Sequence, residues 1–390
     1  MFRTQIKASV VAANQERSPE FALWQAVIAQ AITDAKYNGL RKPYLECKRL
    51  AIAWFSNCSK DFKKVCECAD INPEYAHNKF KSAVQQGKFQ LTSKQNKILR
   101  LLDMAFATVQ NRNRVNLVLI DTYSTQNFYY AVIVAALCRF FKLPYMPILH
   151  GGNLPGRLKK NKRLSKALFG KALMNIAPSK FMMGQFQNAG FQNITYIPNT
   201  LKIENYPFQL RASITPKLLW VRSFSEIYNP LLALEIVEIL KKKGFDASLC
   251  MVGPDKDGSM QRCKKIAAEL KLPINFTGMM RKEEWIALSK DFDIFISTTN
   301  FDNMPVSIME AMALGMPVIS TNVGGMPFLI ENGTDGILVP ANSPESFVQA
   351  IEELCANPLK VQNITKNARI KMENLDWEKV KHKWIKLLGE

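Results

Sequence analysis

Two carboxylates and one guanidinium stand where they could act on a ligand that carries both hydroxyls and phosphates. Asp302 and Glu310 lie eight positions apart, and Arg222 directly follows the apolar run 218–221. A carboxylate accepts hydrogen bonds from hydroxyl groups, whereas a guanidinium can bind two phosphate oxygens at once. These residue types predict binding of a phosphorylated, hydroxyl-rich ligand, provided that the fold brings them together.

The stretch 295–325 has the pattern of strand, loop, helix, strand and glycine turn. Apolar runs at 295–297 and 317–320 predict buried parallel strands on either side of a helix over 306–314. Parallel sheets bind ligands at the carboxyl ends of their strands, and the free N–H groups of a helix N-terminus favour phosphate. The backbone of 303–306 is therefore a predicted phosphate site.

This stretch resembles the signature of retaining glycosyltransferase family 4, whose members have the GT-B fold. In that family a Glu-x7-Glu pair precedes a run similar to AMALGMPVIST and a Gly-Gly turn, here Gly324 and Gly325. One departure is Asp302, which stands where the family usually has Glu. The resemblance covers roughly 98–390 and includes three shorter motifs: HGG at 150–152, APS at 177–179 and IPN at 197–199.

The resemblance implies an enzyme that moves a sugar from a nucleotide diphosphate sugar to a glycan, lipid-linked or surface-polysaccharide acceptor, with retention of configuration. It implies that Asp302 accepts hydrogen bonds from the sugar, that Glu310 accepts them from the ribose, and that His150 completes the catalytic set. The implied donor-binding residues are Arg222, Gly278, Met280, Asn303, Met304, Pro305, Val306 and Glu310. Gly151 and Gly152 are expected on the acceptor or phosphate side, and neither a cofactor nor a metal ion is expected.

Strands and helices alternate from residue 98 onward, which predicts an α/β fold with two Rossmann-like domains and parallel sheets. We expect the first domain over 98–205 and the second over 212–372. An amphipathic helix over 375–390 follows, and the resemblance implies that it returns to the first domain. A helical segment over 1–90 precedes the two domains.

Two features of the family pattern are missing from the sequence. Family members open with a strand and a glycine-rich loop, but nothing before residue 115 reads as that unit, so the first domain is expected to be incomplete. A lysine–glycine pair that contacts the diphosphate is replaced by Ile-Tyr-Asn-Pro at 227–230. An alternative is therefore a catalytically impaired nucleotide-sugar-binding protein fused to a helical module that binds DNA or a partner. A nucleotide-sugar epimerase on the same fold would need a carboxylate and histidine arrangement that the sequence does not show.

The segment 1–90 contains two further patterns. A turn at 70–73 separates two short helical stretches, which is similar to a helix-turn-helix and more loosely to small phage-type helical domains. The residues early in the second stretch are poor base-reading candidates, which argues against nucleic acid as a partner. Cys47, Cys58, Cys66 and Cys68 could hold zinc, but the eight cysteines show no Cys-x-x-Cys spacing, and this favours reduced thiols.

The net charge of +19 indicates an anionic partner. The run 156–171 contains basic residues and no acidic ones, with leucines between them, so it could lie on an anionic membrane surface or be a solvated basic helix. The predicted membrane patch is Arg157, Lys159, Lys160, Lys162, Arg163 and Lys166. No apolar run is long enough to span a bilayer, and we expect a cytoplasmic protein, peripheral on the inner face of the membrane.

Overall fold

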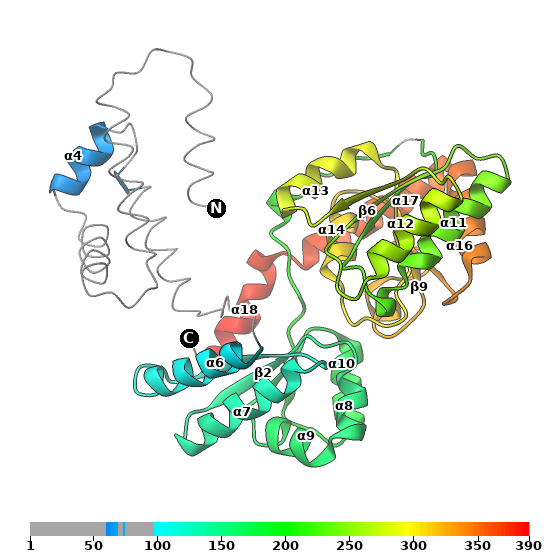
Figure 1. The fold of residues 1–390 in the computed structure, drawn as a ribbon. Helices are drawn as coiled ribbons and strands as arrows, with labels where there is room; N and C mark the ends of the chain where they lie inside the picture. Colours follow the sequence, from blue (N-terminus) through cyan, green and yellow to red (C-terminus); the bar gives the residue numbers. More distant parts are fainter. Residues whose placement is uncertain (1–59, 69–72, 75–96, 212, 390) are drawn as a thin grey trace. The chain divides into compact units, whose positions relative to one another are not determined.

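The computed structural model describes residues 60–68, 73–74, 97–211 and 213–389 (Figure 1). The chain divides into two compact units, Met1–Arg100 and Leu101–Glu390. In the first unit, helix α4 (Lys60–Cys68) buries Phe62, Val65 and Cys66, which lie on one helical face because they are three and four positions apart. Most of the helical segment predicted over 1–90 lies outside the described residues, as do Cys47, Cys58 and most of the predicted turn at 70–73.

The first sheet has four parallel strands in chain order, β1-β2-β3-β4. Its core contains apolar residues from both the strands and the helices, including Ile120, Phe128, Leu149 and Phe169. Helix α7 contacts β1 and β2, and α9 packs against α7 (Figure 1). The strands are β1 (Val118–Thr122), β2 (Tyr145–Leu149), β3 (Asn175–Ala177) and β4 (Ile194–Tyr196). The helices are α6 (Lys97–Asn111), α7 (Asn127–Phe140), α8 (Leu154–Lys160), α9 (Lys162–Phe169) and α10 (Lys180–Asn188).

Strand β1 lies at the edge of this sheet. Among the described residues, no strand precedes it in the chain. Within the described part of the chain, the first sheet thus begins at β1, in the stretch that follows residue 115.

The second sheet has six parallel strands in the order β10-β9-β8-β5-β6-β7. The chain adds strands on one side of β5 and then crosses to its other side with β8, which makes the gap between β5 and β8 the switch point of the sheet. Ligands of open α/β sheets bind outside the carboxyl ends of the strands at such a point. The strands are β5 (Lys217–Val221), β6 (Ser248–Val252), β7 (Ile274–Gly278), β8 (Ile294–Ser297), β9 (Val318–Thr321) and β10 (Ile337–Val339).

Helices cover both faces of this second sheet (Figure 1). One core contains Trp220, Ile236 and Phe347, and the other contains Phe295, Ile308 and Met312 on the opposite face. The helices are α11 (Pro230–Lys242), α12 (Ser259–Glu269), α13 (Lys282–Leu288), α14 (Val306–Ala313), α15 (Met326–Leu329), α16 (Pro344–Ala356) and α17 (Pro358–Asn374). Short 3-10 turns are η1 (Ile203–Asn205), η2 (Glu226–Tyr228) and η3 (Ser289–Asp291). The GT-B-like arrangement of two parallel-sheet domains, predicted from the sequence, is confirmed.

The last helix, α18 (Trp377–Leu388), packs on the first sheet. Its Val380 is buried against Met146 and Ile176. Just before it, the chain runs beside the linker between the two domains, where Leu201 pairs with Asp376 as an isolated β-bridge. Among the described residues, no helix is long and apolar enough to cross a membrane.

Candidate functional site

The loop 298–305 joins β8 to α14 and is held in place by the glycine pair. The Gly325 N–H donates to the Asp302 carbonyl at 2.9 Å. A Cβ on Gly325 would lie 1.8 Å from the carbonyl oxygen of Asn303, and one on Gly324 would lie 2.2 Å from that of Asp302. Only glycine permits this approach, so the Gly-Gly turn fixes the backbone on which Asp302 is carried.

Arg222 and Asp302 meet across the switch point. Arg222 follows β5, and its Nη2 forms an ion pair with Oδ2 of Asp302 in the loop after β8. The guanidinium also lies 4.5 Å from the ring centroid of Tyr228, a cation–π contact. Burial lowers the pKa of Arg222, and the nearby Tyr228 acts in the opposite direction. The two groups that the sequence assigned to the sugar and the diphosphate therefore lie side by side.

Tyr228 occupies the stretch where the family pattern places a lysine. Thr298 ties this stretch to the loop after β8, because its hydroxyl donates to the Tyr228 carbonyl at 2.9 Å and accepts from Trp220 Nε1 at 3.0 Å. Asn229 has a positive φ of 44°, and Pro230 begins α11 directly after it. An aromatic ring beside Arg222 thus lies in the stretch where the family pattern has a second cation.

Glu310 is buried in the second turn of α14, with 4 % of its surface exposed. Its Oε1 accepts hydrogen bonds from the Tyr206 hydroxyl at 2.7 Å and from the Lys282 ammonium at 2.7 Å. Burial raises the pKa of Tyr206 to about 12. For Lys282, burial lowers the pKa, but its hydrogen bonds to Glu310 and Tyr206 outweigh that effect and raise it to about 12. Both side chains therefore stay protonated near neutral pH and donate to Glu310.

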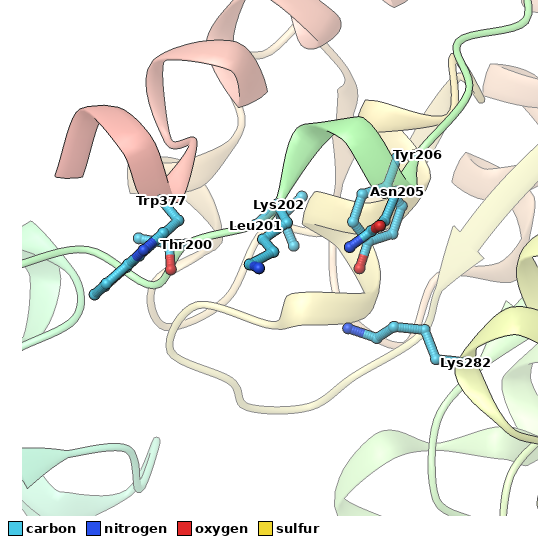
Figure 2. Close-up of a pocket in the computed structure, with 7 residues that line it drawn as sticks. All are labelled: Thr200, Leu201, Lys202, Asn205, Tyr206, Lys282 and Trp377. Carbon is cyan, nitrogen blue, oxygen red and sulfur yellow. The ribbon is translucent and has the colours of Figure 1, made fainter. Parts of the chain in front are cut away.

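An open cavity of about 350 Å³ adjoins this group (Figure 2). Lys282 enters it from α13 on one side, and the linker with Lys202 and Tyr206 forms another wall. Trp377, the first residue of α18, closes one end. The cavity is lined by Thr200, Leu201, Lys202, Asn205, Tyr206, Lys282 and Trp377.

Asn303 and Met304, which are predicted to bind the donor, contact the first domain. The buried Asn303 side chain accepts from the Ser179 hydroxyl through Oδ1 and donates to the Leu149 carbonyl at 3.4 Å. The Met304 carbonyl accepts from Asn199 Nδ2 at 3.0 Å. The polar ends of the APS and IPN motifs therefore hold the loop after β8. Pro305 is the residue before α14, and Val306 is the first helical residue, 38 % exposed.

His150 lies at the end of β2 and is oriented by a carboxylate that the sequence did not single out. Its Nε2 lies 2.9 Å from Asp121 Oδ1, and its ring stacks on Tyr123 with centroids 5.5 Å apart. Gly151 and Gly152 follow. A Cβ on Gly151 would lie 2.3 Å from the backbone nitrogen of Ser124, and one on Gly152 would lie 3.4 Å from the Asp302 backbone. The HGG motif thus brings the first sheet against the loop that carries Asp302.

Gly278 and Met280 lie at the carboxyl end of β7. Gly278 has a φ of +72°, and its carbonyl accepts from the Gly253 N–H at 2.8 Å. Met279 is 81 % exposed, whereas Met280 packs partly buried against the core beneath α14. The exposed Met279 therefore follows this strand end, three positions before the Lys282 that reaches Glu310.

The Asp-Lys-Asp sequence at 255–257 is a structural turn. Asp257 accepts hydrogen bonds from Ser225 Oγ and the Glu226 N–H, both at 2.9 Å, and from Ser259. These hydrogen bonds, with Ser259 contributing most, hold the pKa of Asp257 at about 2. Among the described residues, no three His, Cys, Asp or Glu side chains are grouped so that they could hold a metal ion.

The predicted membrane patch needs a correction. Leu158, Leu168 and Phe169 are buried in the core of the first domain, so the apolar residues of the basic run cannot enter a bilayer. Arg157 is also engaged: its Nε donates to the Ser124 carbonyl at 2.6 Å, and its guanidinium lies 5.4 Å from the Phe128 ring centroid. The exposed basic residues that remain, which we call the α8–α9 basic face, are Lys159, Lys160, Lys162, Arg163 and Lys166.

Three residues of the site were not predicted from the sequence: Tyr206, Lys282 and Asp121. Tyr206 and Lys282 are 104 and 28 positions from Glu310, and no local spacing signals their contact. Asp121 could have been found, because it lies near the carboxyl end of an apolar strand, and His150 directly follows the neighbouring strand.

Comparison with known proteins agrees with this geometry. Residues 202–371 match the family model described as glycosyl transferases group 1. The chain is 23 % identical over 262 residues to the amylovoran biosynthesis glycosyltransferase AmsK of Erwinia amylovora, covering 63 % of this chain and 64 % of that one. It is 26 % identical over 197 residues to an Escherichia coli UDP-Gal:alpha-D-GlcNAc-diphosphoundecaprenol alpha-1,3-galactosyltransferase, covering 46 % and 50 %. The chain thus spans less than two thirds of the length of these relatives.

The fold has solved counterparts. The crystal structure of Anabaena HepE in complex with UDP-glucose superposes with a TM-score of 0.66 at 18 % identity, covering 80 % of this chain and 89 % of that one. This likeness extends over both parallel-sheet domains. Residues 202–371 therefore carry the glycosyl transferases group 1 pattern, on a chain with the GT-B fold.

Proposed function

We propose that this protein is a retaining glycosyltransferase of family 4 type that transfers a sugar from a nucleotide diphosphate sugar. The observation that carries the proposal is the pairing of Arg222 with Asp302 at the carboxyl ends of β5 and β8, with Glu310 buried on the helix that follows. A matching family model over residues 202–371 supports the same reading.

Each residue of the site has a separate proposed role. Arg222 and the first N–H groups of α14 stabilise the departing diphosphate, because both present donors and positive charge at the switch point. Asp302 accepts hydrogen bonds from the sugar, and Glu310 accepts them from the ribose. The bond from C1 of the sugar to the phosphate oxygen breaks, a bond from C1 to the acceptor oxygen forms on the same face of the ring, and the proton of the acceptor hydroxyl leaves with the diphosphate.

The acceptor is proposed to be a glycan, a lipid-linked saccharide or a surface polysaccharide. Support comes from relatives named for amylovoran biosynthesis and for a diphosphoundecaprenol-linked acceptor. His150, held by Asp121, and the Gly151–Gly152 turn would face this acceptor from the first domain. We further propose that transfer needs no divalent cation, and that the α8–α9 basic face brings the protein to the inner face of an anionic membrane.

The test is a transfer assay of the full chain with a panel of UDP-, GDP- and dTDP-sugars, started with UDP-glucose because HepE was crystallised with it. We expect release of nucleoside diphosphate and transfer to a lipid-linked acceptor with at least one donor, undiminished by EDTA. Glu310→Gln should lower kcat/KM more than tenfold. Binding of a donor without release or transfer across the panel would contradict the proposal, and the anomeric configuration of the product, read by NMR, tests retention.

A further inference from the structure

The Glu310 carboxylate is held on one side only. Both hydrogen bonds to it, from Tyr206 and from Lys282, end on the same oxygen, Oε1. Within the described part of the chain, Oε2 has no hydrogen-bond partner. A carboxylate can accept about four hydrogen bonds, two at each oxygen. The arrangement therefore fixes the rotation of the carboxylate and leaves one oxygen for a ligand.

We propose that Tyr206 and Lys282 are positioning residues that orient Glu310 to accept the ribose hydroxyls of the donor, and that they set the preference of the site for ribonucleotides. This inference rests on the proposed function, since it concerns the residue assigned there to the ribose. Neither side chain is required to touch the reacting sugar.

The two positioning residues come from different parts of the fold. Lys282 begins α13, four residues after Gly278 at the end of β7. Tyr206 ends the η1 turn of the linker between the two domains. Their side chains also contact one another, because the Lys282 ammonium lies 5.7 Å from the Tyr206 ring centroid. Glu310 is thus held by a pair of donors that support each other from two separate elements.

Burial makes the orientation sensitive to each donor. Glu310 and Tyr206 are buried, at 4 % and 2 % exposure, so water cannot fully replace a lost partner. Lys282 is half exposed and brings the only positive charge that directly contacts Glu310 among the described residues. Tyr206→Phe removes one hydrogen bond without changing the shape of the ring, and Lys282→Gln removes the charge. Both changes should let the carboxylate rotate.

The readout is the ratio of affinities for UDP and 2′-deoxy-UDP, measured by calorimetry on the full chain. We expect the wild type to bind UDP at least tenfold more tightly than 2′-deoxy-UDP, because a site built to bind a hydroxyl rejects a ligand that lacks it. Tyr206→Phe and Lys282→Gln should each lower this ratio three- to tenfold. A purely structural role would lower the melting temperature and leave the ratio unchanged.

Matched controls are Tyr196→Phe, on a tyrosine in β4, and Lys290→Gln, on an exposed lysine in η3, and neither should change the ratio. If Tyr206→Phe fails to fold, Lys282→Gln carries the test, because its side chain is half exposed. A wild-type ratio that persists in both variants, or a wild type that binds both nucleotides equally, overturns the inference. A wild type that binds neither UDP nor any other nucleoside diphosphate overturns the proposed function itself.

Discussion

Arg222 and Asp302 form an ion pair across the switch point of the six-stranded sheet, between the ends of β5 and β8. Each is assigned to a different part of the donor, Arg222 to the diphosphate and Asp302 to the sugar. A phosphate that binds Arg222 therefore competes with Asp302 for the guanidinium. With the proposed roles, the pair would set a balance between binding the nucleotide and binding the sugar.

Substitution of the two members of this pair should have opposite effects on nucleotide binding. Asp302→Asn frees the guanidinium, so we expect the affinity for UDP to stay equal or rise about threefold, while transfer falls about a hundredfold. Arg222→Gln removes a charged donor, which contributes about 1.5–3 kcal/mol, so the affinity for UDP should fall more than tenfold. Calorimetry and the transfer assay measure both. Equal losses of UDP affinity in the two variants would show that the pair does not compete with phosphate.

Gly325→Ala should disable the site more than it harms the fold. A Cβ at this position would lie 1.8 Å from the Asn303 carbonyl oxygen, so the loop that carries Asp302 must move. Overpacking of this kind costs about 1–3 kcal/mol, and we expect nucleotide affinity to fall more than tenfold. The control is Gly184→Ala in α10, where a Cβ meets nothing within 4 Å and should be neutral or stabilising. Normal UDP binding by Gly325→Ala would contradict the assigned role of the glycine pair.

The α8–α9 basic face should bind anionic vesicles without insertion. The full chain should co-sediment with phosphatidylglycerol vesicles at low salt and dissociate at high salt, because each cation near the surface contributes about 1 kcal/mol. Changing the five residues of the face to glutamine should abolish binding. The control is a variant with five exposed lysines of the second domain changed to glutamine: Lys256, Lys264, Lys265, Lys271 and Lys290. Equal loss of binding in both variants would show that net charge, and not this face, is responsible.

Asp257 should make the stability of the second domain depend on pH at the acid end. Its pKa is lowered to about 2, so the stabilisation is present above the unfolded value near 3.8 and is lost as the pH falls through about 2. Because the side chain is exposed, we expect only about 1 kcal/mol. The free energy of unfolding, measured in urea between pH 4 and pH 2, should fall less steeply with pH in Asp257→Asn than in the wild type. An unchanged pH dependence of the free energy of unfolding would mean that the turn at 255–257 does not contribute to it.

The strands predicted at 295–297 and 317–320 are observed as β8 and β9, because both are continuous apolar runs bounded by turns. The sequence also located Arg222, Asp302 and Glu310, whose positions at strand ends and on the following helix carry over directly into the structure. Such features are local in the sequence, and the topology of a parallel sheet brings them together at the carboxyl ends of its strands.

What the sequence could not show were partners from distant segments. The hydrogen bonds from Tyr206 and Lys282 to Glu310, and from Ser179 to Asn303, depend on how the linker and the two domains pack. The apolar residues of the basic run show the same limit. Apolar residues between basic ones, such as Leu158 and Leu168, can face either a membrane or a protein core, and only the fold decides between the two.

The chain passes between the two domains twice, and the two passages run together. The Leu201 N–H donates to the Leu375 carbonyl at 3.2 Å, and the Trp377 N–H donates to the Leu201 carbonyl at 2.8 Å. A single strand could swivel freely, but two strands tied by hydrogen bonds resist twisting and still permit bending. Any change in the angle between the two domains must therefore bend both segments together or break these hydrogen bonds.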